Sequence, residues 1–141
     1  MRNSTFYDTL ERKLRSDIEL EASAVEFFTN IPCPAAIFDL ETYTFLVVNK
    51  AFAKILEYAE EELVEAPMSK ITHPDDLQTS TAEVESNIKT AKDLSENYTY
   101  VNRYVTKSGT VLTLKWQGWN NYSLMKSFCI VEVIKENGGA E

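Results

Sequence analysis

Several residue types are scarce in this 141-residue chain, and each scarcity argues against a class of function. One histidine, His73, and two cysteines, Cys33 and Cys129, are too few for a zinc site or a catalytic triad. The four glycines form no phosphate-binding loop, and the acidic clusters lack the spacing of a calcium loop. We therefore expect no metal, no catalytic residues and no enzyme, and we interpret both cysteines as free core thiols.

Long apolar runs and an excess of basic residues are also missing. No stretch approaches the roughly 18 apolar residues of a membrane span, and the polar start of the chain leads into no signal-peptide core. The net charge of -8 repels phosphate backbones and anionic lipids. The sequence thus predicts a cytoplasmic protein that binds neither nucleic acid nor membrane.

What the chain does contain is enough apolar surface for one folded domain, because 44% of its residues are hydrophobic. Residues 1–29 are predicted to form an amphipathic helix that docks or dimerises, since apolar residues recur every three, four or seven positions. The proposed dimerisation residues are Phe6, Leu10, Leu14, Ile18 and Val25. Proline at positions 32 and 34 ends this helix.

Two strands are expected next, over 35–40 and 45–48, joined by a short polar link. Both faces of each strand are apolar, so both sides of their sheet need a cover. Asn49 is expected to cap a helix over 50–58. A short acidic turn at 60–63 and a short segment at 68–71 follow.

A long helix is predicted from about residue 74 to 92, with Thr72 or His73 as its cap and Pro74 in its first turn. The last third reads as three strands, over 98–106, 111–119 and 127–134. The final strand is apolar on both faces and should be central, whereas the tyrosine- and threonine-rich strand suits an edge. Residues 136–141 are expected to be a flexible tail. This order of elements indicates an α+β fold.

Three motifs in register resemble the PAS family, as found in bacterial multi-PAS sensor kinases. The stretch from Phe45 to Phe52 resembles the second strand running into the first core helix, and the stretch from Ile71 to Leu77 resembles the His-Pro-acid-Asp start of the long helix. The residues from Asn102 to Gly109, with Trp116, resemble the third and fourth strands. The resemblance covers residues 30–135 and implies a five-stranded antiparallel sheet, order 2-1-5-4-3, with core helices on one face.

The chain departs from the family pattern at three places. Glu57 stands where glycine is common, and Ala59 stands where a capping serine or threonine is common. The output motif that ends the last strand, Asp-Ile-Thr in many members, corresponds here to Glu132-Val133-Ile134. Coupling to an output helix is therefore expected to differ from that of the typical member.

The resemblance also bears on cofactors. Haem-binding members use a histidine in or near the long helix, and residues 78–92 contain none. Members that form a flavin adduct carry a cysteine in the short central helix, and residues 68–71 contain none. We therefore expect neither haem nor covalent flavin. His73 is expected to be structural.

Two functions from different classes stay open. The first is a sensor in signal transduction, with a homodimer through the N-terminal helix and a downstream kinase or cyclase output domain as in two-component systems. It would bind a small apolar ligand, or a partner protein, at a site lined by Phe38, Phe52, Ile55, Leu56, Ile71, Val84, Ile88 and Trp116. The second is an interaction module whose core is filled by these same residues and which only dimerises.

Overall fold

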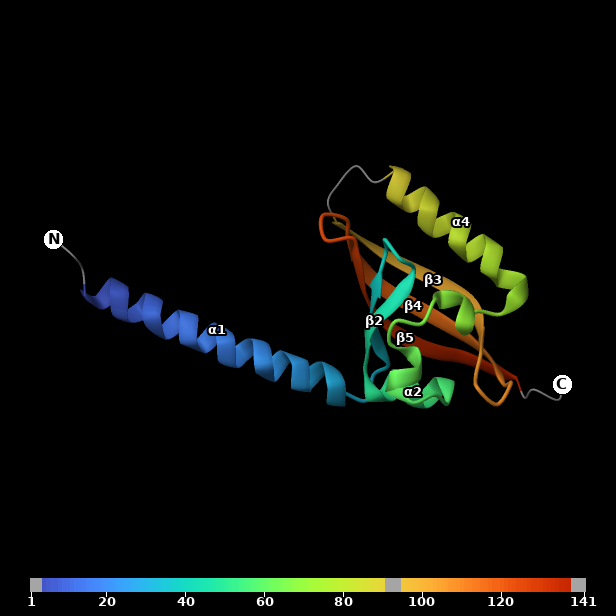
Figure 1. Cartoon of the computed structure of the whole chain (residues 1–141), viewed down its shortest axis with the longest axis horizontal. Coiled ribbons are helices and arrows are strands. Elements are labelled where there is room, and N and C mark those ends of the chain that lie inside the picture. Colours follow the sequence, from blue (N-terminus) through green and yellow to red (C-terminus); the bar gives the residue numbers. More distant parts are fainter. Residues whose placement is uncertain (1–3, 91–94, 138–141) are drawn as a thin grey trace.

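The computed structural model describes residues 4–90 and 95–137, which form five strands and a set of helices (Figure 1). The first half contains α1 (Ser4–Asn30), β1 (Ala35–Asp39), β2 (Thr44–Val48), α2 (Lys50–Leu56) and α3 (Glu60–Leu63). A short 3-10 helix, Met68–Lys70, leads to α4 (Pro74–Thr90), and β3 (Ser95–Val105), β4 (Val111–Asn121) and β5 (Lys126–Asn137) complete the order. The acidic segment expected as a turn is the helix α3.

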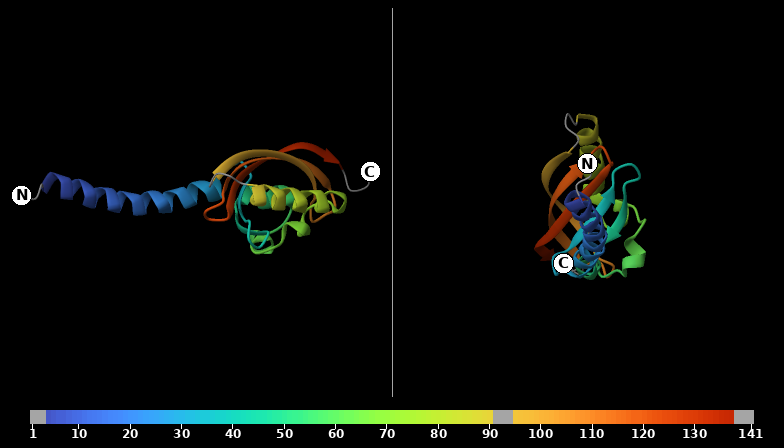
Figure 2. Two further views of the ribbon diagram at one scale, coloured as in Figure 1. Left: turned by 90° about the horizontal axis from the view of Figure 1, so that it is seen from above. Right: turned by 90° about the vertical axis from the view of Figure 1, so that its left-hand side faces the viewer.

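All strand pairs are antiparallel, and the sheet order is β2-β1-β5-β4-β3. The predicted order is thus confirmed, with β5 in the centre and β3 at an edge. Helices α2, α3 and α4 lie on the concave side of the curved sheet (Figure 2). We call that side the inner face and the opposite side the outer face.

Asn49 fixes the junction between β2 and α2, as its predicted capping role requires. Its Oδ1 accepts hydrogen bonds from the backbone N–H of Phe52 at 2.9 Å and of Ala35 at 3.0 Å. Its Nδ2 donates to the Cys33 carbonyl at 2.8 Å. The side chain is fully buried, so these bonds satisfy polar atoms that would otherwise be costly to bury. One residue therefore caps α2 and holds the start of β1.

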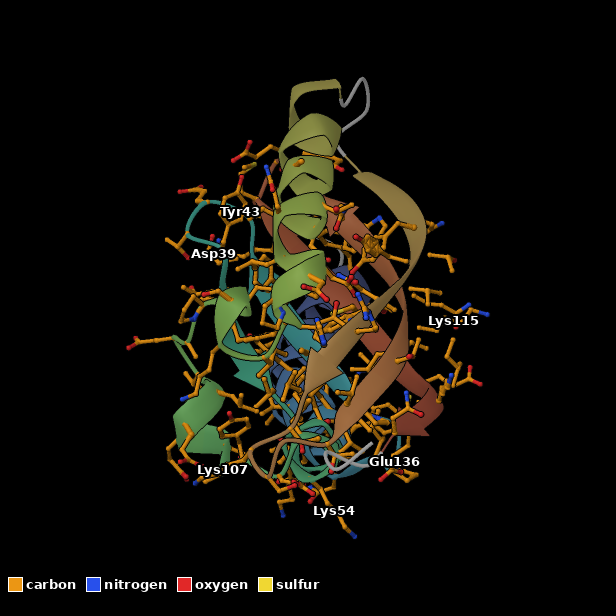
Figure 3. All side chains as sticks on the ribbon, turned by 90° about the vertical axis from the view of Figure 1, so that its right-hand side faces the viewer. Asp39, Tyr43, Lys54, Lys107, Lys115 and Glu136 are labelled. Carbon is orange, nitrogen blue, oxygen red and sulfur yellow. The ribbon has the colours of Figure 1, made fainter. Side chains whose placement is uncertain are left out.

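The departures at Glu57 and Ala59 have local consequences. Glu57 ends α2 in the left-handed region (φ 65), where glycine is unstrained, and its carboxylate accepts hydrogen bonds from the backbone and hydroxyl of Ser108. Ala59 begins α3 without a side-chain cap, although the Glu62 carboxylate accepts from the Ala59 N–H. Glu62, a residue of α3, also forms an ion pair with Lys107 at 2.8 Å. Figure 3 shows Lys107. These contacts fasten the turn between β3 and β4 to the helices.

Helix α1 leaves the body of the molecule and does not lie on the sheet (Figures 1 and 2). The helix therefore does not dock on the sheet of its own chain, which was one of the two roles predicted for it. A hydrogen bond of 3.1 Å from Lys50 to Asn30 fixes its C-terminal end beside α2. On the outer face, large side chains remain exposed at Val47 (41%), Trp119 (39%) and Ile130 (44%).

The last strand is longer than predicted. Strand β5 continues to Asn137, which pairs with Val111, so the first two residues of the expected tail are in the sheet. Residues 138–141 lie outside the described part of the chain. The pairing with β4 skips Ile134, because Leu114 faces Val133 and Thr113 faces Lys135. A bulge thus stands where the family's output motif has its threonine.

No helix in the described residues is long and apolar enough to cross a membrane.

Candidate functional site

The start of α4 is attached to β3 by two residues of the His-Pro-acid-Asp motif. The His73 Nδ1 accepts a hydrogen bond from the Asp75 backbone N–H at 3.1 Å, so His73 caps the helix. Of the two predicted caps, Thr72 and His73, the second is confirmed. The Asp76 carboxylate accepts from Arg103 Nη2 at 2.7 Å, from Nε at 3.0 Å and from the backbone N–H at 2.9 Å. The two sequence motifs therefore meet in space.

Five of the eight predicted ligand-site residues lie in the buried core, between the sheet and the helices. They are Phe38, Phe52, Leu56, Ile71 and Trp116, and none is more than 5% exposed. Aromatic rings form a continuous chain here, from Phe38 to Phe45, Phe52, Trp116 and Tyr104, with centroids 5.5 to 5.7 Å apart. The structure thus brings these five side chains together, packed on one another.

The other three predicted ligand-site residues, Ile55, Val84 and Ile88, are not among these five. Ile55 is half-buried and packs against the core. The side chains of Val84 and Ile88, on α4, lie outside what the structure describes.

Ile55 also lines a pocket of about 480 Å³ at the surface, beyond the end of α1. The 32–34 segment, Gln117 of β4 and residues 130–133 of β5 complete its lining. Cys33 lies in this pocket and is half-buried, so its prediction as a core thiol was wrong, although both cysteines are free.

Polar side chains are interleaved with apolar ones on the inner face below α4. Tyr98, on β3, reaches across Gly118 of β4 to hydrogen-bond Ser127 of β5 at 2.8 Å. A Cβ on Gly118 would lie 2.5 Å from the Tyr98 ring, so only glycine leaves room for this crossing. Asn102 donates to Ser80 of α4, whose hydroxyl also lies 3.3 Å from that of Tyr100.

This polar set is the part of the site that sequence reasoning missed. The alternation of Tyr98, Tyr100 and Tyr104 along the sequence is that of residues on one face of a strand. In the structure the first two are half-buried and Tyr104 is buried, whereas Thr99 and Val101 are exposed. The partners Ser80, Asn102 and Ser127 carried no such signal. They come from three separate elements, which only the fold brings together.

Two buried polar atoms of β4 have no hydrogen-bond partner among the described residues, Trp116 Nε1 and Asn120 Oδ1. Burial raises the pKa of the Tyr104 phenol, and the nearby Trp116 and Asn102 side chains partly counter this rise. The indole N–H therefore lies near the Tyr104 hydroxyl without meeting hydrogen-bond geometry. Leaving such a donor unsatisfied costs about 1–3 kcal/mol.

Burial also disfavours the charged forms of two other groups on the inner face, Tyr98 and Cys129. Burial raises the pKa of Tyr98 well above the phenol's ordinary value. Burial also raises the pKa of the Cys129 thiol to about 12, and this thiol donates to the Ala36 carbonyl at 3.3 Å. Cys129 is therefore an unreactive core thiol, as predicted. Within residues 4–90 and 95–137, no group of three or more potential metal ligands occurs.

The predicted dimerisation residues lie along α1. Phe6, Leu10 and Val25 are 57%, 42% and 62% exposed, and Phe27 beside them is 69% exposed. The side chains of Leu14 and Ile18 fall outside the described set.

Comparison with known proteins decides the family. The sequence profile described as the PAS fold matches residues 45–123, which is more than half of the chain. The chain belongs to the PAS family. PAS domains are generally sensory modules rather than catalytic ones.

Solved PAS structures share the fold at low identity. A PAS domain of an HTR-like protein from Haloarcula marismortui has a TM-score of 0.67 and 17% identity, covering 87% of this chain and 99% of its own. A PAS domain from a two-component sensor histidine kinase has a TM-score of 0.64 and 22% identity, covering 84% and 98%. The RpfR quorum-sensing receptor PAS domain from Cronobacter turicensis, solved in complex with BDSF, has a TM-score of 0.61 and 12% identity, covering 75% and 97%. No curated protein matches the chain.

Proposed function

We propose that this PAS module senses a small molecule bound between α4 and the inner face of the sheet. The observation that carries the proposal is the buried, unpartnered N–H of Trp116, which lies among apolar and aromatic side chains. Small-molecule sites are mostly apolar, with a few polar groups that fix orientation. A largely apolar molecule with one hydrogen-bond acceptor fits this description. The RpfR domain, of the same fold, is an example of a PAS domain that binds a small molecule.

Native mass spectrometry of the purified chain, with two tryptophan variants, tests the proposal. Trp116→Phe removes the indole donor and is expected to reduce the fraction of protein that carries bound mass. Trp119→Phe is the matched control, because Trp119 lies on the outer face and packs on Phe128 with centroids 5.4 Å apart. Unmodified chain without bound mass contradicts the sensor proposal.

We propose that the module works without haem or flavin and without catalysis of its own. His73 supports the first point, since its Nδ1 is occupied by the helix cap. An absorbance spectrum of the purified chain, with no band beyond that of protein, is the expected result.

Activity would then belong to a kinase or cyclase output domain, which we propose as the downstream partner. We propose the cytoplasm as the compartment of this chain, because its two cysteines are free thiols. The net charge of -8 argues against nucleic acid and membrane partners.

We further propose a homodimer formed through α1, whose exposed apolar residues need a partner surface. Light scattering on the full chain and on a chain lacking residues 5–29 tests this. We expect a dimer for the first and a monomer for the second. An unchanged molar mass after the deletion would show that another surface forms the dimer.

The second candidate function is an interaction module with a filled core. The ring chain from Phe38 to Tyr104 favours it, because these side chains already pack on one another. In that case the tryptophan variants behave alike in mass spectrometry, and only the deletion of residues 5–29 changes function.

A further inference from the structure

The charges of α1 are divided between its two halves. The three basic residues of the helix, Arg12, Lys13 and Arg15, stand in the N-terminal half, where they outnumber the two acidic residues Asp8 and Glu11. The acidic residues Asp17, Glu19, Glu21 and Glu26 stand in the C-terminal half, which contains no basic residue. The midpoint of the helix Ser4–Asn30 is residue 17, so every basic residue lies before the centre, and the excess of acidic residues lies in the C-terminal half.

This division favours one orientation for a pair of identical helices. A parallel pair would place the acidic half beside the acidic half of the partner. An antiparallel pair centred on residue 17 places Glu19 and Glu21 of each copy beside Arg15 and Lys13 of the other, and these four attractions outweigh the two Asp8–Glu26 contacts. Each exposed ion pair contributes only about 0.2–1 kcal/mol, but the attraction occurs twice in the symmetric pair, and the parallel alternative replaces it with repulsion.

The apolar features at the two ends of α1 fit the same orientation. Phe6 and Tyr7 are exposed at the N-terminal end, with ring centroids 5.2 Å apart. The pocket of about 480 Å³ opens just beyond the C-terminal end and is lined by Pro32, Cys33 and Ile130. The helix extends away from the body (Figure 2), and its 27 residues span about 40 Å. An antiparallel partner therefore brings its aromatic end to the mouth of this pocket.

We propose that two copies of this chain pair through α1 in an antiparallel arrangement, with the aromatic end of each helix at the partner's pocket. This proposal rests on the homodimer proposed above and adds its orientation. The two sheets then lie at opposite ends of the helix pair. The occupant of the pocket is the partner's α1, around Phe6 and Tyr7.

Distances between spin labels separate the two orientations. Asp8 and Glu26 are exposed residues on either side of the midpoint, each nine positions away, and each substitution removes one negative charge. The labelled variants are Asp8→Cys and Glu26→Cys in a Cys33→Ser background, which leaves only the buried Cys129. An antiparallel pair predicts a separation of about 27 Å along the axis for either variant with itself. Mixing the two variants adds a separation of about 10 Å, which is one interhelical distance.

The parallel arrangement gives the opposite pattern, with about 10 Å for each variant alone and about 27 Å added on mixing. That result, in a sample that light scattering shows to be dimeric, would overturn the orientation and leave the dimer intact. A monomeric molar mass for the labelled variants and for the unlabelled chain would overturn both proposals. The expected result is a dimer with long separations in each pure sample and a short one only in the mixture.

Discussion

Asp76 joins α4 to the edge strand β3 through both the side chain and the backbone of a single residue, Arg103. The pair is bidentate, and the Asp76 side chain is 19% exposed while that of Arg103 is 43% exposed. Three hydrogen bonds thus converge on one carboxylate at the first turn of the helix. Because α4 also covers the polar inner face, this pair positions one wall of the candidate site.

Replacing Asp76 with alanine should destabilise the fold by about 1–2 kcal/mol, since it leaves the Arg103 backbone N–H and guanidinium without their acceptor. Asp75→Ala is the matched control, because the Asp75 side chain is 75% exposed. Urea unfolding measures both free energies. Equal losses for the two variants would show that the attachment to β3 contributes nothing beyond helix-end charge.

The stabilisation from Asp76 should depend on pH in a defined direction. Hydrogen bonds from Arg103 hold the pKa of Asp76 below its ordinary value of 3.8. A depressed pKa stabilises the folded state above the unfolded value and loses this effect as pH falls through the folded value. The difference in unfolding free energy between the unmodified chain and Asp76→Asn should be constant near neutral pH and shrink below 3.8. A gap that widens in acid contradicts the assignment.

Restoring a capping residue at position 59 should stabilise the protein. Ala59 precedes α3 in an extended conformation without a side-chain acceptor. Ala59→Ser supplies a hydroxyl oxygen for a free N–H of the first turn, which should add about 0.5–1 kcal/mol. The control is Ala82→Ser, at an exposed position inside α4, which should lower stability by a few tenths of a kcal/mol. Thermal unfolding compares the two, and a gain of similar size at both positions would rule out capping as the cause.

Adding a methyl group at Gly118 should be destabilising for a steric reason. The new Cβ would lie 2.5 Å from the Tyr98 ring, and overpacking of this kind costs about 1–3 kcal/mol. Combining Gly118→Ala with Tyr98→Ala should remove the clash, so the two losses should be strongly non-additive in a double-mutant cycle. Gly109→Ala provides the contrast. Gly109 has open space around it but a φ of 96, so Tyr98→Ala should not relieve its cost.

The predictions from sequence that held were those set by local chemistry or by periodicity. Asn49 and His73 are polar residues placed directly before helices, and both cap them. The tyrosine- and threonine-rich strand β3 lies at an edge of the sheet, as its composition predicted. The order of strands came from the family resemblance together with the doubly apolar first and last strands.

The predictions that missed depended on long-range placement. Cys33 looks like a core residue in sequence, but the bend after α1 places it in a surface pocket. The α3 segment was predicted as an acidic turn but is a helix. Its residue Glu62 is stabilised there by an ion pair with Lys107, which is 45 positions away in the chain. Strand β5 extends to Asn137 because β4 offers it partners up to Val111. Nothing near these residues in sequence reports such neighbours.

The sequence by itself determined most of the elements and the caps at Asn49 and His73, because hydrophobic periodicity and capping are local effects, and its motifs pointed to the family. It also determined the division of charge along α1. Only the tertiary structure decided that the Tyr98 ring crosses Gly118, that Ser80 meets Asn102, and that the Trp116 N–H is buried without a partner. These relationships join residues on different strands and on α4. Their energies arise from contact and desolvation, which exist only once the chain has folded.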